Sequence, residues 1–482
     1  MEKSIDLIII GLYLIGVAVF GILVGGKQKS IKDYFLGSKA VPWWAVCFSI
    51  VAAETSTLTF ISIPGLAYLT NLNFLQVTIG YLIGRIIVAV FFLPQYYKGE
   101  LSTAYAYLED RFGQKTRAFS SIIFLFTRTA ADGVRLFATA IPLKLLLDIN
   151  YPTAIIIIAI VTLIYTTTGG LKGVIWVDVI QMFIYIGGAL IAGYLLIFNY
   201  LPNGWQSLLD AASLDDKLNI INFGFDDGIA GFFSKPYTFI GGILGGAFLS
   251  MASHGTDQLI VQRLLSTKDL KSSQKAIIGS GVIVIFQFLL FLVVGVALYA
   301  YYGTLNLRAD EIFPKFIIEN LPVGISGIII AGLFAAAMST LAGSISSLSS
   351  STMLDLYKPF SKSTDDKKEL KISRLFTLMW AVLLVLSAIF FMNSSQVVVE
   401  LALSIASFTY GGLLGTFLLG LFVKKAKQED ALAGFASGIF IMITVISLKL
   451  VAWTWFTIIG VITTMFIGFL LSSLNNNKIK KS

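Results

Sequence analysis

Residues 42–68 read PWWAVCFSIVAAETSTLTFISIPGLAY, an apolar stretch that is long enough to cross a lipid bilayer. Its centre, residues 52–57, is the polar run AAETST, which places the carboxylate of Glu54 and several hydroxyl groups at mid-membrane. A charged side chain at the centre of a transmembrane helix costs about 2.5–3.5 kcal/mol on insertion scales. The run therefore predicts a helix that breaks at mid-membrane and frees backbone carbonyls to hold a cation.

The rest of the chain has the composition of a polytopic membrane protein. Of its 482 residues, 56% are hydrophobic and only 13% are charged, and long apolar segments recur along the whole length. The net charge of +8 lies in short loops between these segments, so a lipid bilayer, and not nucleic acid, is the expected surrounding. Cys47 is the only cysteine, which excludes an intrachain disulfide and makes a cysteine metal site untenable.

Segments of spanning length predict an all-α polytopic membrane protein with about thirteen transmembrane helices in a single domain over residues 1–482. The expected spans are 5–25, 43–70, 74–97, 117–146, 152–168, 174–199, 236–262, 276–302, 323–356, 372–392, 396–423, 430–450 and 453–473. The second to sixth and the seventh to eleventh spans form two sets of five. Because five is odd, the second set runs inverted to the first, as in transporters with an inverted repeat.

The charges of the loops predict the orientation. Lysine and arginine gather in loops after odd-numbered spans, for example Lys268 and Lys271, whereas loops after even-numbered spans carry acidic patches such as Asp215 and Asp216. The positive-inside rule then places the N-terminus outside and the C-terminus in the cytoplasm of a multi-pass protein of the plasma (inner) membrane. Two outer loops, 200–235 and 303–322, are long enough for short helices over the external mouth. The first span lacks a signal-peptide cleavage site and is expected to be retained.

Hydroxyl groups are concentrated in the ninth span, where AAAMST at residues 335–340 is followed by six serines before residue 352. Such side chains can serve helix packing alone. Together with the broken second span they indicate a sodium site, because sodium is a hard cation that prefers oxygen ligands.

Two further spans carry charges. Asp178 lies about one turn inside the sixth span and is either an interfacial cap or a group that faces the cation route. Arg128, Asp132 and Arg135 share one helix face because they are four and three residues apart. We expect Asp132 to compensate both arginines; the remaining positive charge could pair with Glu54 or with a carboxylate on a substrate.

Glycines in the seventh and eleventh spans permit further irregular helices. In the seventh span they precede SHGTDQ at residues 253–258, where His254, the only histidine, can hydrogen-bond near a cavity or simply pack. In the eleventh span Tyr410 precedes two glycines and either gates a cavity or is an interfacial aromatic residue. The sequence holds no phosphate-binding loop and no catalytic or metal-ligand set, so neither an enzyme nor ATP-driven transport is expected.

The chain resembles the sodium:solute symporter family over nearly its whole length. The matching segments are the broken second span, TAYAYLEDRF at 103–112, TGGLKGVIWVD at 168–178, TDQLIVQR at 256–263, the ninth-span Ala/Ser run and the glycine-rich residues 410–420. The resemblance implies the five-plus-five inverted-repeat (LeuT-like) fold. Within it we expect an extra N-terminal helix at 5–25, a first repeat at 43–199, a second repeat at 236–423 and two C-terminal helices at 430–473.

The resemblance also implies sodium as the coupling ion and a set of site residues. The sodium ligands would be Ala52, Thr55, Ala336, Ser339 and Thr340, with Asp178 nearby. Ala342 and Gly343 occupy the positions where some members carry the serines of a second sodium site, so one sodium per substrate is expected. The substrate-binding residues would be Ser56, Thr59, Phe60, Phe74, Thr78, Arg135, Thr256 and Tyr410.

The implied function is sodium-coupled symport of a small organic solute by alternating access. The solute would be a sugar, a sialic acid, an amino acid or a carboxylate; Thr59 and Thr256 replace the Gln or Asn of sugar-binding members, which argues against a galactose-like substrate. The alternatives are a proton-coupled carrier of the same fold, with Glu54 or Asp178 as proton carrier, and a passive channel. A channel would need a continuous polar lining, whereas the polar groups here cluster at mid-span. No obligate protein partner is indicated.

Overall fold

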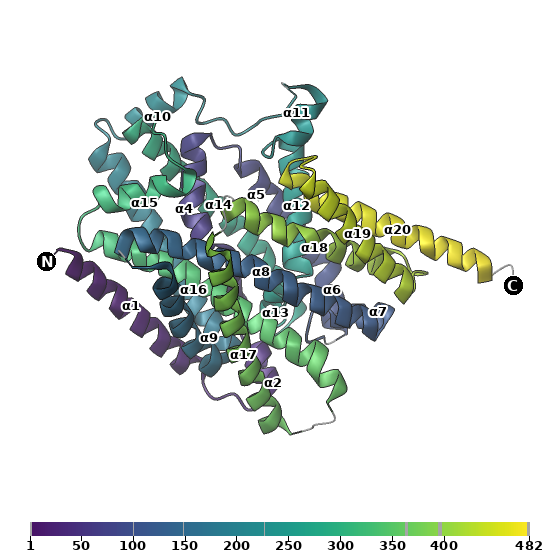
Figure 1. The fold of residues 1–482 in the computed structure, drawn as a ribbon. Coiled ribbons are helices and arrows are strands. Elements are labelled where there is room, and N and C mark those ends of the chain that lie inside the picture. Colours follow the sequence, from purple (N-terminus) through teal and green to yellow (C-terminus); the bar gives the residue numbers. More distant parts are fainter. Residues whose placement is uncertain are drawn as a thin grey trace.

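Helices make up nearly all regular structure in the computed structural model, which describes residues 2–99, 101–147, 149–225, 227–361, 365–393 and 398–479 (Figure 1). No strand occurs in these ranges beyond an isolated bridge between Val41 and Thr267. Some residues of the predicted loop-charge pattern, Asp226, Lys362, Lys480 and Lys481, lie outside the described residues. The prediction of an all-α membrane protein is confirmed.

The helices follow one another as α1 (Glu2–Gly25), α2 (Ile31–Leu36), α3 (Trp43–Glu54), α4 (Thr57–Leu69), α5 (Leu75–Ile87), α6 (Leu93–Lys98), α7 (Ala106–Phe112), α8 (Gln114–Leu147), α9 (Tyr151–Leu195), α10 (Trp205–Leu214), α11 (Gly228–Ser234), α12 (Phe239–Gly255), α13 (Gln258–Leu264), α14 (Leu270–Tyr302), α15 (Ala309–Glu319), α16 (Ile325–Ser351), α17 (Asp366–Phe390), α18 (Val398–Phe422), α19 (Gln428–Ser447) and α20 (Phe456–Ile479). Single π-helical turns join α5 to α6 and extend α9 and α16.

Among the described residues, eight helical segments are long and apolar enough to cross a membrane, and the bent pair α3–α4 makes a ninth. One of the eight, Tyr151–Tyr200, has 50 residues and would extend about 75 Å if straight, more than twice the hydrocarbon thickness of about 30 Å. It is interrupted at Gly170, whose φ of 58° and ψ of −164° suit only glycine. The predicted loop between spans 152–168 and 174–199 is thus a kink within α9. The count of thirteen spans stays a prediction.

The helix predicted to break at residues 52–57 is broken there. Thr55 has an extended backbone with ψ of 95°, and α3 and α4 meet at an angle of 65°. The last backbone bond of α3 joins the Thr55 N–H to the Val51 carbonyl at 3.0 Å, so the carbonyls that follow leave the helical pattern. Ser56 then caps α4 by accepting a hydrogen bond from the Thr59 N–H.

The seventh span is broken as well. Helix α12 ends at Gly255, and α13 begins at Gln258 after a turn formed by Thr256 and Asp257. The Asp257 side chain caps α13 by accepting from the Leu259 N–H at 2.9 Å. The glycines of this span permit a break, and the structure contains one.

Helix α16 lies at the centre of the bundle, where 89% of its spanning window is buried, whereas α1 is at the periphery with 17%. Helix α16 packs on α9, α8, α17 and α1. Its first turn is capped by α1, because Asp6 accepts from the N–H groups of Gly324 (2.7 Å) and Gly327 (3.0 Å) and from the Ser326 hydroxyl (2.7 Å).

Short helices occupy both loops that were predicted to lie outside: α10 and α11 in the first and α15 in the second, along the upper part of Figure 1. Helix α15 packs directly on α4, since a Cβ atom at Gly65 would overlap the Ala309 carbonyl. This contact places the start of α15 beside the broken helix.

Candidate functional site

A cavity of about 550 Å³ lies against the α3–α4 break. Its walls come from α3, α4, α5, α8, α12, α13, α14 and α18, and the start of α15 lines it through Arg308, Ala309 and Asp310. The cavity thus runs from the middle of the bundle toward the end that carries α15. Its volume is within the range of about 300–1,000 Å³ that is usual for small-molecule sites.

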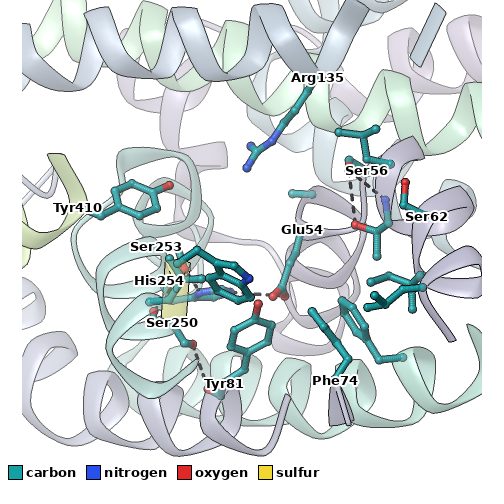
Figure 2. Close-up of a pocket in the computed structure, with 18 of the residues that line it drawn as sticks. Glu54, Ser56, Ser62, Phe74, Tyr81, Arg135, Ser250, Ser253, His254 and Tyr410 are labelled. Carbon is teal, nitrogen blue, oxygen red and sulfur yellow. Dashed lines mark hydrogen bonds and ion pairs between the residues drawn. The ribbon is translucent and has the colours of Figure 1, made fainter. Parts of the chain in front are cut away.

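Five of the eight residues predicted to bind substrate line this cavity. Ser56 and Thr59 do so from the start of α4, Phe74 from the N-terminal end of α5, Arg135 from α8 and Tyr410 from α18. Figure 2 shows Arg135 reaching into the cavity from the helix above, with Tyr410 to its left and Glu54 below.

The other three predicted residues, Phe60, Thr78 and Thr256, do not line the cavity. Phe60 is fully buried and packs edge-on against Phe291. The hydroxyl of Thr78 donates to the Leu75 carbonyl at 2.8 Å, and that of Thr256 donates to a carbonyl of its own helix. The expectation that all eight share one surface is therefore wrong for this conformation.

The predicted sodium ligands lie on adjoining elements. Ala52 and Thr55 end α3, and Ala336, Ser339 and Thr340 belong to the middle of α16. The Thr57 hydroxyl at the start of α4 donates to the Leu333 carbonyl of α16 at 3.1 Å, which ties the break to that helix. Carbonyl and hydroxyl oxygens are the donors that a hard cation prefers, so this set is chemically suited to sodium.

Asp178 is a buried neighbour of these residues. Its Oδ1 accepts from the Ser339 hydroxyl at 2.6 Å, and its Oδ2 accepts from the Ser49 hydroxyl at 2.5 Å and from Arg263 at 3.0 Å. The alternative of an interfacial cap is wrong, because the side chain is fully buried.

Arg263, the cationic partner of Asp178, was missed because it was assigned to the end of the seventh span. Its guanidinium lies against Gly343, where a Cβ atom would be only 2.8 Å from a guanidinium nitrogen. The absence of a side chain at this position therefore leaves the room that the arginine occupies.

The charges of α8 compensate one another as predicted. Asp132 pairs with Arg128 and, at 3.0 Å, with Arg135. The structure adds Asp257 of the second break, which pairs with Arg128 at 2.9 Å and accepts from the Tyr410 hydroxyl at 2.7 Å. Tyr410 is consequently a cavity residue and not an interfacial aromatic residue.

Glu54 pairs with neither arginine of α8, which corrects that alternative. Its Oε2 is bound by Arg85 of α5, a fully buried side chain that also donates to the Ser280 hydroxyl at 2.8 Å. His254 lines the cavity with its Nε2 atom 3.6 Å from the same oxygen. A lone arginine within the apolar residues 74–97 was the signal that could have identified this partner.

In the described part of the chain, no group of three or more His, Cys, Asp or Glu residues is arranged to hold a metal ion. The cation chemistry available at this site therefore depends on the carbonyl and hydroxyl oxygens of the break and α16.

Comparison with known proteins identifies related transporters. The family described as "Sodium:solute symporter family" matches residues 34–438. The "Sodium/sialic acid symporter NanT" of Aliivibrio fischeri is 29% identical over 480 residues, covering 97% of this chain and 92% of the relative. The "Sodium/sialic acid symporter SiaT" of Proteus mirabilis is 30% identical over 436 residues, with 88% and 85% covered.

A solved structure extends this similarity to the fold. It is described as "Substrate-bound outward-open state of a Na+-coupled sialic acid symporter reveals a novel Na+-site". It superposes with a TM-score of 0.88 at 28% identity and covers 98% of each chain.

Proposed function

Because the chain belongs to the sodium:solute symporter family and is a multi-pass, sodium-coupled transporter with the inverted-repeat fold, not an enzyme, we propose that it carries a small organic solute bearing a carboxylate. The observation that supports this most directly is Arg135. Its side chain is 24% exposed and lines the cavity, and in the described part of the chain one of its nitrogens, Nη1, is bound to Asp132. The other N–H groups are available for a carboxylate, which a guanidinium binds in bidentate fashion.

The charge balance of the cavity supports the same substrate class. Arg128 and Arg135 are offset by Asp132 and Asp257, so this network is neutral before anything binds. A sodium ion adds one positive charge to the low-dielectric interior, and a carboxylate close to it offsets that charge. Two relatives are named for sialic acid, which is itself a carboxylic acid.

The proposed sodium ligands are the carbonyls of Ala52, Thr55 and Ala336 and the hydroxyls of Ser339 and Thr340. The Thr340 hydroxyl is free to reorient, because its present bond at 3.1 Å is to the Ala336 carbonyl of its own helix. One sodium per substrate is proposed because Ala342 and Gly343 lack the hydroxyls of a second site, and because Asp178 already has Arg263 as its cation.

In the proposed cycle, sodium and the solute enter from outside, and the two repeats, 43–199 and 236–423, rock against each other to release both inside. The N-terminus would be outside in a bacterial inner membrane and the C-terminus in the cytoplasm. With a singly charged acid the cycle moves no net charge, and the sodium gradient supplies the driving force. A zwitterion would carry one net charge and gain about 2.3 kcal/mol per 100 mV.

The test is thermal unfolding of the purified protein with a panel of organic acids and neutral sugars, in sodium and in potassium. We expect acids to raise the melting temperature only in sodium. Arg135→Gln should weaken their binding at least about tenfold, because a charge-assisted pair contributes about 1.5–3 kcal/mol. Arg374→Gln on α17, which does not line the cavity and donates to the Gln28 side chain at 3.1 Å, is the control and should bind acids as the wild type does. Stabilisation by neutral sugars without any effect of acids would refute the carboxylate proposal.

A further inference from the structure

Glu54 faces the substrate cavity with one of its oxygens uncommitted. It is the last residue of α3, its side chain is 19% exposed, and it lines the cavity. In the described part of the chain only Oε2 has partners, namely Arg85 and, at a longer distance, His254. Arg85 is itself fixed by Ser280, so the carboxylate is held in one orientation with Oε1 left free.

His254 presents a second unsatisfied group at the same wall. Its Nδ1 lies 2.8 Å from the Ser253 hydroxyl, whereas its Nε2 is buried without a hydrogen-bond partner in the described chain. The 3.6 Å that separates Nε2 from the Glu54 carboxylate is too long for a hydrogen bond. A buried polar atom in this state costs free energy, which a ligand that bonds to it would recover.

We propose that Glu54, with His254 beside it, recognises a hydrogen-bond donor on the substrate, either an ammonium or a hydroxyl group. This inference rests on the proposed function, because it concerns the second end of the same carboxylate-bearing solute. Arg135 reaches into the cavity from the helix above in Figure 2, so its unpaired N–H groups and the free Oε1 of Glu54 belong to different walls of the cavity. The substrate class is therefore an amino acid or a hydroxy acid, and not an unsubstituted carboxylate.

An unsubstituted carboxylic acid would leave polar groups of the cavity without hydrogen-bond partners. It would occupy the cavity and exclude water, yet offer no donor to Oε1 and no partner to His254. Sites built to bond a hydroxyl or amino group discriminate strongly against analogues that lack it, because the site's own polar groups remain unpaired.

A purely structural role is the alternative, in which the Glu54–Arg85 pair only joins α3 to α5. Buried ion pairs can often be replaced by apolar residues without loss of stability, whereas removal of one partner is costly. The double variant Glu54→Leu/Arg85→Met removes both charges and separates the two roles. Glu369→Leu/Lys358→Met is the matched control, since Glu369 is buried and pairs with Lys358 at 2.9 Å outside the cavity.

The experiment measures binding by thermal unfolding in sodium, with pairs of carboxylic acids that differ by one amino or one hydroxyl group. We expect the wild type to bind the substituted member of at least one pair about tenfold or more tightly. The Glu54 double variant should keep its sodium response but prefer neither member by more than about threefold, while the Glu369 control keeps the wild-type preference. If the double variant does not fold, Glu54→Gln serves instead and should weaken the amino acids more than the hydroxy acids.

Acid pairs that differ by an amino group test for an ammonium donor, and pairs that differ by a hydroxyl group test for a hydroxyl donor. The remaining outcomes distinguish this inference from the carboxylate proposal. Equal binding of both members of every pair by the wild type would overturn this inference and leave the carboxylate proposal intact. A double variant that still discriminates would show that Glu54 is structural. No stabilisation by any acid in sodium would overturn both proposals.

Discussion

At the scale of single residues, the contact between Ser339 and Asp178 determines what the serine can offer a cation. A serine hydroxyl has one proton, and that of Ser339 is donated to Asp178 at 2.6 Å. Ser49 and Arg263 hold the aspartate in place from its other oxygen. The lone pairs of Ser339 are consequently available to a metal ion, which is the arrangement expected for a ligand supported by a second layer of contacts.

Removal of either hydroxyl should therefore weaken sodium binding. We expect Ser339→Ala and Thr340→Ala each to raise the sodium concentration for half-maximal thermal stabilisation about tenfold or more, as losses at metal sites commonly do. Ser347→Ala is the control, because the Ser347 hydroxyl is buried in the same helix but donates only to the Ser344 carbonyl. An unchanged sodium response in both site variants would mean that the ligands are elsewhere.

Single residues also mark the limit of what the sequence predicted about the site. Asp132 and Arg135 were paired correctly because residues three positions apart on one helix lie close together on the same face. Glu54 and Arg85 are 31 residues apart on different helices, and nothing local in the sequence specifies which helices meet. The same reason explains why Asp257 was not assigned to Arg128.

At the scale of elements, the packing of α5 on α12 positions the partners of Glu54. Helix α5 carries Arg85 and α12 carries His254. Their backbones touch through small residues: a Cβ atom at Gly246 would overlap the Val77 carbonyl, and one at Gly80 would overlap the Ile243 carbonyl. Glycines allow this close approach between membrane helices, where van der Waals packing replaces the hydrophobic effect.

A single methyl group at this contact should push the two helices apart. We expect Gly246→Ala to lower the melting temperature, because overpacking costs about 1–3 kcal/mol. Gly187→Ala of α9 is the control, since a Cβ atom there would meet nothing within 4 Å and alanine favours the helix. Equal melting temperatures for the two variants would show that α5 and α12 have room to adjust.

At the scale of the whole molecule, hydropathy and the mid-membrane polar run were sufficient to predict the class of fold and the break between α3 and α4, whereas the glycines of the seventh span only permitted a second break. The burial pattern explains this success, since a lipid-facing surface must be apolar and a polar group at depth must face inward. The interruption near Gly170 was predicted as the boundary between spans 152–168 and 174–199, but its form, a kink within α9 instead of a loop, was not. A charge inside an apolar span, such as Arg85, indicates that it has a buried partner, but the sequence does not specify on which distant helix that partner lies.

The orientation of the bundle can be tested with thiol labelling. Cys47, the only cysteine, is buried, so single cysteines can be added against a silent background. In intact cells we expect a membrane-impermeant maleimide to label Asp210→Cys on α10 and to label Lys29→Cys only after lysis, since the lysine-rich loop should be cytoplasmic. Both positions are exposed. The reverse pattern would invert the proposed topology.

The cap that Asp6 places on α16 imposes an order on biosynthesis. Asp6 is synthesised 318 residues before its partner Gly324. Until then the carboxylate has only water and lipid headgroups to bind, and α1 has no completed bundle to dock on. The hydrogen bonds between Asp6 and the start of α16 are thus made late in translation. A nascent chain halted before residue 324 would contain α1 without the residues that its Asp6 caps.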